Sequence, residues 1–232
     1  MVHINKNIQL SLNLKKKRIY EIDNFLVSNS NKEAFELINR WPNWTTRKVI
    51  ILGDNGTGKT HLSTIWKKKT SATILNIKKF KKIKFENFFL KKNFFIIENI
   101  ELFFDKINDK EKQELEKKLL HFYNLIEETK SFLIITSSKS PKFWGIKLPD
   151  LKSRILSSIT VKIKKPDDKL LSLVLVKLFH DKQILIDKKI IKFIVYRSER
   201  SLNNLQKIVD KIDEQSLIAK KKININFVKK LI

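Results

Sequence analysis

One short stretch of the chain has the residue types needed to hold a phosphate group. Residues 53–60 read Gly-Asp-Asn-Gly-Thr-Gly-Lys-Thr and fit the pattern G-x-x-x-x-G-K-[ST]. Three of the four glycines of the chain lie in this stretch, and shuffling a chain of this composition would give such a match only about once in a thousand trials. Glycines let backbone N–H groups curve around a phosphate, and the N-terminus of a following helix adds partial positive charge. The stretch is therefore predicted to be a phosphate-binding loop.

The last residues of this loop supply the charged and metal-binding groups. Lys59 is expected to reach the β- and γ-phosphates of a nucleotide, and the Thr60 hydroxyl is expected to hold Mg²⁺. ATP or ADP with Mg²⁺ is thus the predicted ligand, and the alternative is a glycine-rich turn that binds nothing. The residues predicted to line the nucleotide here are Gly53, Asp54, Asn55, Gly56, Thr57, Gly58, Lys59, Thr60 and His61.

The elements that must position this loop can be read on both sides of it. An apolar run at 49–52 suits a buried parallel strand, and residues 61–66 can continue as a helix. Strands and helices that alternate in this way predict an α/β fold with a five-stranded parallel sheet covered on both faces. The other four strands are expected at 73–77, 94–98, 131–137 and 159–163, with helices at 32–41 and 111–128.

An acid at the end of an apolar strand is the second candidate for chemistry. Phe94–Ile97 is followed by Glu98 and Asn99, and Glu98 is expected to lie near the bound Mg²⁺. The alternative for Glu98 is an acid that faces solvent. An amide cannot take a proton, so Asn99 cannot act as the base that activates water. Glu101 could replace it only if the strand end bends, and nucleotide binding is therefore predicted more firmly than hydrolysis.

The last third of the chain has a purely helical pattern. Pro166 closes the last strand, and a helix can open at Asp167 with an apolar stripe of Leu170, Leu173, Val174 and Phe179. Asp187 and Asn224 are expected to cap later helices, and a further apolar stripe runs from Leu202 to Ile212. The predicted organisation is a flexible tail at 1–15, an α/β base at 16–165 and a small all-α domain at 166–232.

Composition excludes several classes of protein. The chain has 232 residues and no cysteine, which excludes a disulfide scaffold, a cysteine-ligated zinc site and a thiol nucleophile. No apolar run approaches 18 residues and no signal peptide is apparent, so a cytoplasmic protein without membrane contact is expected. The net charge of +25 comes mostly from lysine. It indicates either a solvated surface shaped by compositional bias or direct attraction to DNA.

With these motifs in order, the chain resembles an AAA+ P-loop ATPase of the DnaA clade, whose fold ends in a helical lid. Residues 23–27 resemble the N-terminal signature that borders the adenine pocket in that clade. Residues 134–138 resemble the sensor-1 strand, which implies that Ser138 faces the γ-phosphate. Residues 148–154 resemble box VII, which implies that Arg154 is an arginine finger acting on a neighbouring subunit. Arg200 matches the sensor-2 arginine. The alternatives are a local helix cap for Arg154 and a surface cation for Arg200.

Three features narrow the resemblance to the short DnaA paralogues of the Hda type. First, no helix-turn-helix domain is expected after the lid, because the sequence leaves no room for one. Second, the sequence of the predicted lid resembles that of Hda proteins. Third, the N-terminal tail resembles the clamp-binding peptide of Hda proteins, with alternating leucines after a glutamine. An edge strand is the alternative for this peptide, whose residues are Gln9, Leu10, Ser11, Leu12 and Leu14.

The resemblance implies a negative regulator of chromosome replication initiation. It would bind the sliding clamp of the DNA polymerase and promote hydrolysis of DnaA-bound ATP through Arg154. A homo-oligomer is a further possible assembly. On this view Glu98 and Asn99 give weak or absent intrinsic hydrolysis. Two alternatives stay open: an ATPase of the helicase-loader type that binds single-stranded DNA, and a clamp-binding scaffold without enzymatic action.

Overall fold

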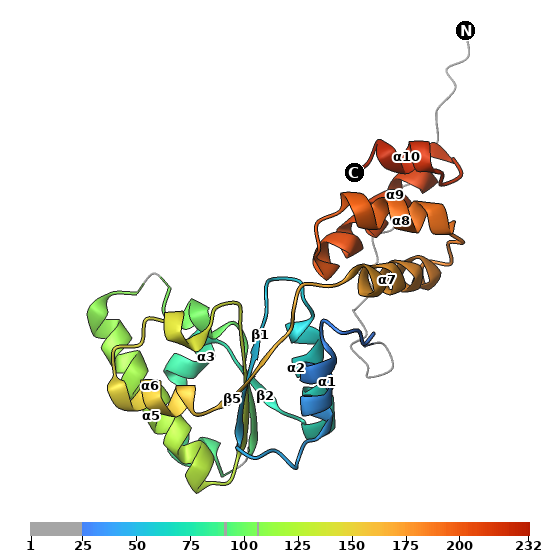
Figure 1. Ribbon diagram of the computed structural model, residues 1–232. Helices are drawn as coiled ribbons and strands as arrows, with labels where there is room; N and C mark the ends of the chain where they lie inside the picture. The colour runs from blue at the N-terminus through green and yellow to red at the C-terminus, as the bar shows by residue number, and fades with distance from the viewer. Residues whose placement is uncertain (1–24, 91, 106) are drawn as a thin grey trace. The chain divides into compact units, whose positions relative to one another are not determined.

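The computed structural model describes residues 25–90, 92–105 and 107–232. The chain divides into two compact units, and the boundary between them lies between Asp167 and Asp168 (Figure 1). The larger unit is an α/β base and the smaller unit is entirely helical. No helix within the described ranges is long and apolar enough to cross a membrane.

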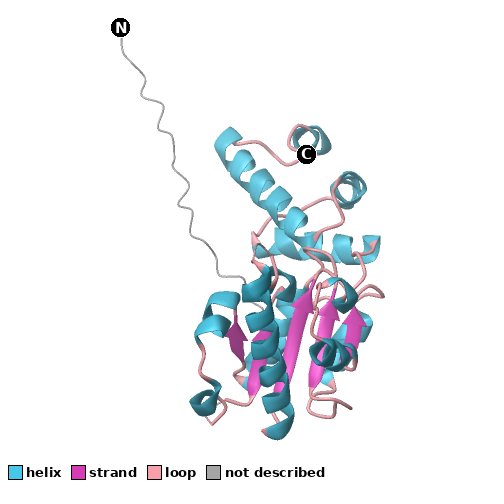
Figure 2. Ribbon diagram, turned by 90° about the vertical axis from the view of Figure 1, so that its left-hand side faces the viewer, coloured by secondary structure: helices cyan, strands magenta, loops and turns pink. Residues whose placement is uncertain are grey.

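Five parallel strands form the centre of the base, as predicted (Figure 2). Their order in the sheet is β2-β3-β4-β1-β5. Because β1 lies between β4 and β5, it is an inner strand and its residues are buried on both faces. The strands are β1 (Lys48–Leu52), β2 (Thr73–Leu75), β3 (Phe94–Ile97), β4 (Phe132–Ser137) and β5 (Ile159–Lys162).

The register of the sheet brings the predicted site residues to one edge. Leu52 of β1 pairs with Ser137 of β4 and with Lys162 of β5. Ile97 of β3 pairs with Ile135 of β4. The segments that begin at Gly53, Glu98 and Ser138 therefore all leave the sheet at the carboxyl ends of neighbouring strands. Ligands bind at this edge in open parallel sheets, near the point where the strand order reverses.

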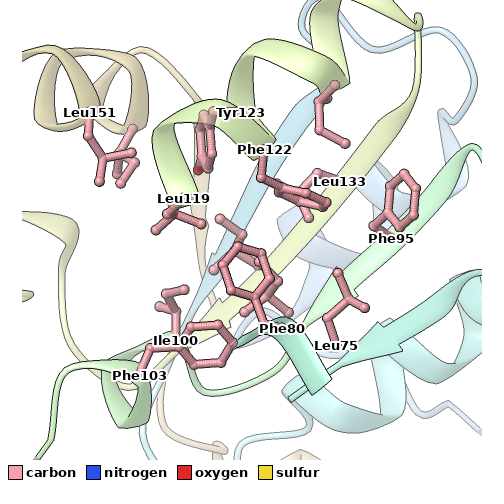
Figure 3. Close-up of a cluster of buried hydrophobic side chains, with 14 of the residues drawn as sticks. Leu75, Phe80, Phe95, Ile100, Phe103, Leu119, Phe122, Tyr123, Leu133 and Leu151 are labelled. Carbon is pink, nitrogen blue, oxygen red and sulfur yellow. The ribbon is translucent and has the colours of Figure 1, made fainter. Parts of the chain in front are cut away.

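Helices cover both faces of the sheet (Figure 1). On one face α1 (Lys32–Asn39) and α2 (Lys59–Thr70) bury Ile38, Leu62 and Trp66 against the strands. On the other face the apolar side chains of α5 (Asp109–Glu128) meet those of the strands (Figure 3). The remaining elements on this second face are α3 (Ile77–Lys82), α4 (Phe85–Phe88), the 3-10 helices η2 (Ile100–Phe103) and η3 (Pro141–Phe143), and α6 (Pro149–Leu156).

Several predicted boundaries were wrong by one or two residues. The second strand ends at Leu75 because the Asn76 side chain accepts a hydrogen bond from the Lys79 N–H and starts α3. The helix predicted at 32–41 ends at Asn39. The helix predicted at 111–128 begins earlier, at Asp109, because Asn108 caps it. The short helices α3 and α4 were not predicted.

The helical unit contains α7 (Asp168–Asp181), α8 (Lys188–Arg197), α9 (Leu202–Ala219) and α10 (Ile225–Lys229). Asp187 and Asn224 cap α8 and α10 through their side chains, as predicted. The apolar stripe of α9 is buried at Leu205, Ile208, Val209 and Ile212. Leu173 was assigned wrongly to the buried face of α7. It is 41% exposed, because the buried positions Leu171 and Leu175 lie two residues away on the opposite side of the helix.

Candidate nucleotide-binding site

The loop at residues 53–60 has the backbone geometry of a phosphate cradle. It leaves the carboxyl end of β1 and runs directly into α2. Gly56 has φ +76° and Gly58 has φ +106°, a left-handed region in which residues with a Cβ are strained. Gly58 is the N-cap of α2, and no side chain caps this helix end. The first N–H groups of a 12-residue helix thus point into the loop, where an anion is favoured.

Gly53 is required by packing rather than by its backbone angles. A Cβ at this position would lie 2.7 Å from Thr57 Oγ1 and 2.9 Å from the Ile163 carbonyl oxygen. The Gly53 N–H donates to the Ser137 carbonyl at 3.1 Å. The Thr57 hydroxyl donates to the Asp54 carbonyl at 2.9 Å and closes the base of the loop. The side chains of Asp54 and Asn55 are exposed at its tip.

Lys59 is the buried cation of this loop. Its side chain is 5% exposed, and its Nζ donates to the carbonyl oxygens of Gly53 at 2.6 Å and Asp54 at 3.0 Å. Burial lowers the pKa of Lys59, and the nearby carboxylates of Glu101 and Asp54 only partly offset this shift. An ammonium group that is desolvated and bonded only to neutral carbonyls gains strongly when a phosphate approaches it.

A serine connects Glu98 to the helix turn that carries Thr60. Glu98 lies one residue beyond β3, and its carboxylate accepts a hydrogen bond from Ser63 Oγ at 3.0 Å. Ser63 lies on the first turns of α2, and its hydroxyl also approaches the Thr60 carbonyl at 3.2 Å. The Glu98 carboxylate thus faces the helix turn that carries the Thr60 hydroxyl. A carboxylate and a hydroxyl are hard oxygen ligands, so this pair fits Mg²⁺.

The chain bends sharply after Glu98, and this bend brings a second acid to the site. Asn99 has φ +51°, its N–H donates to Thr136 Oγ1 at 3.0 Å, and η2 follows directly. The bend turns Glu101 toward the end of β4, where it is 9% exposed. Its carboxylate accepts hydrogen bonds from Ser137 Oγ at 2.8 Å, from the Ser138 N–H at 2.9 Å and from Ser138 Oγ.

The environment of Glu101 keeps it ionised. Burial raises the pKa of Glu101, but the hydrogen bonds from Ser138 and Ser137 outweigh burial and hold this pKa below its ordinary value. The sequence predicted Glu101 only as a substitute base, and its hydrogen bonds to Ser138 were not predicted. The signal present in the sequence is that Glu101 follows the strand-end acid Glu98 by three residues.

Arg154 lies on an exposed surface of the base. It occupies α6 between the buried residues Leu151 and Ile155, and its side chain is 43% exposed. Its Nε donates to Asp150 Oδ1 at 3.1 Å, one turn earlier on the same helix. An exposed ion pair of this kind is weak, so the guanidinium is free to exchange Asp150 for another anion at little cost.

The remaining predicted residues lie in three places. The ring of His61 packs edge-on against Phe25, with 5.1 Å between the ring centroids. The described part of the 23–27 signature therefore lies next to α2, which follows the phosphate-binding loop. Arg200 lies two residues before α9, and its Nη2 is 2.6 Å from Asp168 Oδ1 within the helical unit. Its proposed contact with phosphates stays a prediction. The clamp-binding residues Gln9, Leu10, Ser11, Leu12 and Leu14 lie outside the described residues.

Comparison with known proteins points to DnaA. The chain is 24% identical over 253 residues to the chromosomal replication initiator protein DnaA of Buchnera aphidicola subsp. Cinara cedri, covering all of this chain and 56% of that protein. It is 26% identical to DnaA of Borreliella burgdorferi strain B31 over 234 residues, covering 93% of this chain and 48% of that protein. The chain thus spans about half the length of the curated relatives it matches.

Solved structures show the same fold. Domain III of the Thermotoga maritima replication initiation protein DnaA has a TM-score of 0.77 at 18% identity, and the match covers 93% of this chain and 96% of that one. A replication initiator DnaA bound to AMPPCP and single-stranded DNA has a TM-score of 0.70 at 18% identity, over 88% of this chain and 69% of that one. The Thermotoga maritima RuvB motor has a TM-score of 0.66 at 16% identity, and the match covers 92% of this chain and 71% of that one.

The chain thus has the fold of DnaA domain III, an α/β base followed by a helical lid region. This confirms the fold class predicted from the sequence. A narrower match concerns the lid: residues 168–232 match the family described as "Hda, lid domain". The chain is therefore similar to DnaA over nearly its whole length and similar to Hda over residues 168–232.

Proposed function

We propose that this chain holds ATP or ADP with Mg²⁺ in its own loop and applies Arg154 to a nucleotide on another protein. The observation that carries this proposal is that the phosphate-binding loop has all its expected residues, whereas the acid expected to support hydrolysis is missing. The loop around Lys59 is complete, whereas Asn99 stands where a hydrolytic site needs an acid, and the nearby Glu101 is occupied by Ser137 and Ser138. Arg154 is exposed, and among the described residues its guanidinium pairs with Asp150.

The partner that best fits this arrangement is DnaA. DnaA proteins are similar to this chain in sequence and fold. The resemblance of residues 148–154 to box VII of the DnaA clade implies that Arg154 reaches a nucleotide on a neighbouring subunit. The lid match to Hda supports a regulator rather than an initiator. We therefore assign the chain to negative regulation of replication initiation, by promoting hydrolysis of DnaA-bound ATP. An arginine supplied in trans stabilises transition-state charge and accelerates hydrolysis by about 10³- to 10⁵-fold.

The remaining parts of the proposal concern DNA. Residues 9–14 would tether the chain to the sliding clamp on DNA, with alternate leucines entering pockets of the clamp. The net charge of +25 favours direct contact with phosphates at low salt, and a structurally similar DnaA binds single-stranded DNA. Both contacts would bring the chain to the place where DnaA acts.

The decisive experiment measures hydrolysis of DnaA-bound ATP in the presence of clamp-loaded DNA. The wild-type chain is expected to accelerate hydrolysis, and Arg154→Ala is expected to lower the accelerated rate by about 100-fold or more, because the transition-state contact is lost. Arg154→Lys keeps the charge but loses the planar fork, so it should remain strongly impaired. Asp150→Asn removes the intrachain ion pair and keeps Arg154, so it should retain activity.

The alternatives give different results in the same assays. Intrinsic ATP hydrolysis that single-stranded DNA stimulates, with no effect on DnaA-bound ATP, would support a helicase-loader type of ATPase. Clamp binding without any change in DnaA-bound ATP would support a scaffold. Full acceleration by Arg154→Ala would refute the proposed role of this arginine.

A further inference from the structure

The segment that connects β4 to the helix of Arg154 is fixed at both ends by buried carboxylates. We call this segment, residues 138–148, the connecting strap. At its start the Ser138 N–H donates to Glu101 Oε1 at 2.9 Å. In its middle the Trp144 ring is 3% exposed, and its Nε1 donates to Ser137 Oγ at 3.1 Å and to the Lys139 carbonyl at 2.8 Å. Glu101 and Trp144 thus share the Ser137 hydroxyl.

At the end of the strap, Glu116 of α5 binds the two backbone amides that precede α6. The Leu148 N–H donates to Glu116 Oε2 at 2.7 Å, and the Lys147 N–H lies 3.0 Å from Oε1 and 3.1 Å from Oε2. Glu116 is 2% exposed, although its α5 neighbour Glu114 is exposed to solvent. A buried carboxylate is costly unless it is fully hydrogen-bonded, so these two amides fix both the carboxylate and the strap.

This anchor sets the start of the helix that carries Arg154. Leu148 is the N-cap of α6, and its own side chain provides no cap bond, while Pro149 opens the helix. The side-chain hydrogen bonds at the N-terminal end of α6 therefore come from Glu116. The body of the helix is held by the buried side chains of Leu151 and Ile155. Together these contacts fix the backbone from which the Arg154 side chain projects.

We propose that Glu116 is a positioning residue for Arg154, which acts by anchoring the end of the connecting strap. This inference rests on the proposed function of Arg154 as a finger in trans. Misplacement of a transition-state group by about 1 Å can cost about 100-fold in rate, so a small tilt of α6 has a large effect. The strap also ties this helix to Ser138 at the nucleotide edge of the sheet.

Glu116→Gln tests the anchor with little change of shape. Glutamine keeps one acceptor oxygen and replaces the other by an NH₂ group. With its oxygen at the Oε2 position, glutamine can still accept from both amides, but the Lys147 N–H then also faces an NH₂ donor, and both bonds lose the negative charge of the carboxylate. Glu114→Gln is the matched control, because it makes the same change of charge on an exposed residue of the same helix. Glu116→Asp keeps both oxygens but shortens the reach by one methylene, and it serves if the glutamine variant does not fold.

The assay is single-turnover hydrolysis of DnaA-bound ATP on clamp-loaded DNA, titrated with each variant. Glu116→Gln is expected to lower the maximal rate by about tenfold and to leave the half-saturating concentration within twofold. Glu114→Gln should behave as the wild type. Because Glu116 acts through Arg154, the double variant with Arg154→Ala should be no slower than Arg154→Ala alone. Hydrogen exchange over residues 144–156 should rise in Glu116→Gln and stay unchanged in Glu114→Gln.

Each outcome decides between the two ideas. If Arg154→Ala loses activity and Glu116→Gln keeps the full maximal rate, the positioning role is wrong and the proposed function stands. The positioning role is also wrong if Glu116→Gln slows the Arg154→Ala background by the same factor as the wild type, since that result indicates a general structural effect. If Arg154→Ala keeps full activity, the proposed function fails and the positioning role fails with it.

Discussion

Replacing Lys59 by methionine is expected to separate nucleotide binding from stability. Lys59 is 5% exposed, and within the described part of the chain its ammonium donates to the carbonyls of Gly53 and Asp54. Burial of a charge costs several kcal/mol, whereas hydrogen bonds to a charged group return about 1.5–3 kcal/mol each. These terms nearly cancel, and methionine fills a similar volume without a charge. The free energy of unfolding of the nucleotide-free protein should therefore change by less than about 1 kcal/mol.

The effect on nucleotide binding should be much larger. In the bound state Lys59 is expected to contact two phosphates, and each charge-assisted bond is worth about 1.5–3 kcal/mol. Loss of both amounts to about 3–6 kcal/mol, which corresponds to roughly 10²- to 10⁴-fold weaker binding. The backbone cradle and the N-terminus of α2 remain, so residual binding at high concentration is expected.

Two measurements test this prediction together. Urea unfolding without nucleotide reports the free energy of unfolding, and titration calorimetry with ADP or ATP and Mg²⁺ reports affinity. Lys67→Met is the control. It makes the same change of charge, and Lys67 is exposed on the same helix. Nucleotide affinity within threefold of the wild type in Lys59→Met would refute the cradle. A loss of more than about 3 kcal/mol of stability would show instead that Lys59 is a structural residue.

Three further predictions concern other parts of the chain. The pKa of Glu101 is lowered in the folded state, so its ionised form stabilises the protein at pH values above the unfolded pKa. The free energy of unfolding in urea should therefore differ between the wild type and Glu101→Gln at pH 7. This difference should vanish as the pH falls through the folded pKa. Gly53→Ala should destabilise the protein by about 1–3 kcal/mol in the same assay and weaken nucleotide binding, because its Cβ meets the Ile163 carbonyl. Gln9→Ala with Leu12→Ala should abolish clamp binding in a pull-down or surface-binding assay without changing nucleotide affinity; retained clamp binding would exclude the tether.

The sheet and its loop were predictable because their signals are local. The pattern from Gly53 to Thr60 requires a strand before it and a helix after it, and both are present. The apolar runs near Phe94 and Phe132 are short and bounded by polar residues, as buried parallel strands are. The predictions failed mainly at element ends, where one capping side chain such as Asn76 decides the boundary.

The polar anchors could not be predicted because they join residues far apart in the chain. Glu101 and Ser138 are separated by 37 residues, and Glu116 and Leu148 by 32. A signal does exist for Glu116, because it lies one turn before Leu119 and two turns before Tyr123 on the buried side of α5. An acid on such a stripe indicates a buried hydrogen-bond acceptor, but the sequence does not name its partner.

The strand order explains why β4 can connect the predicted nucleotide site to Arg154. Because β4 lies between β1 and β3, its end adjoins the loop of Lys59 on one side and the acids after β3 on the other. The carboxylates of Glu98 and Glu101 therefore lie at the edge where the phosphates of a nucleotide are expected. A bound triphosphate adds negative charge beside them, so Mg²⁺ should be needed more for ATP than for ADP. The same strand continues into the strap that leads to Arg154, which gives the nucleotide end of β4 a covalent and hydrogen-bonded route to that residue.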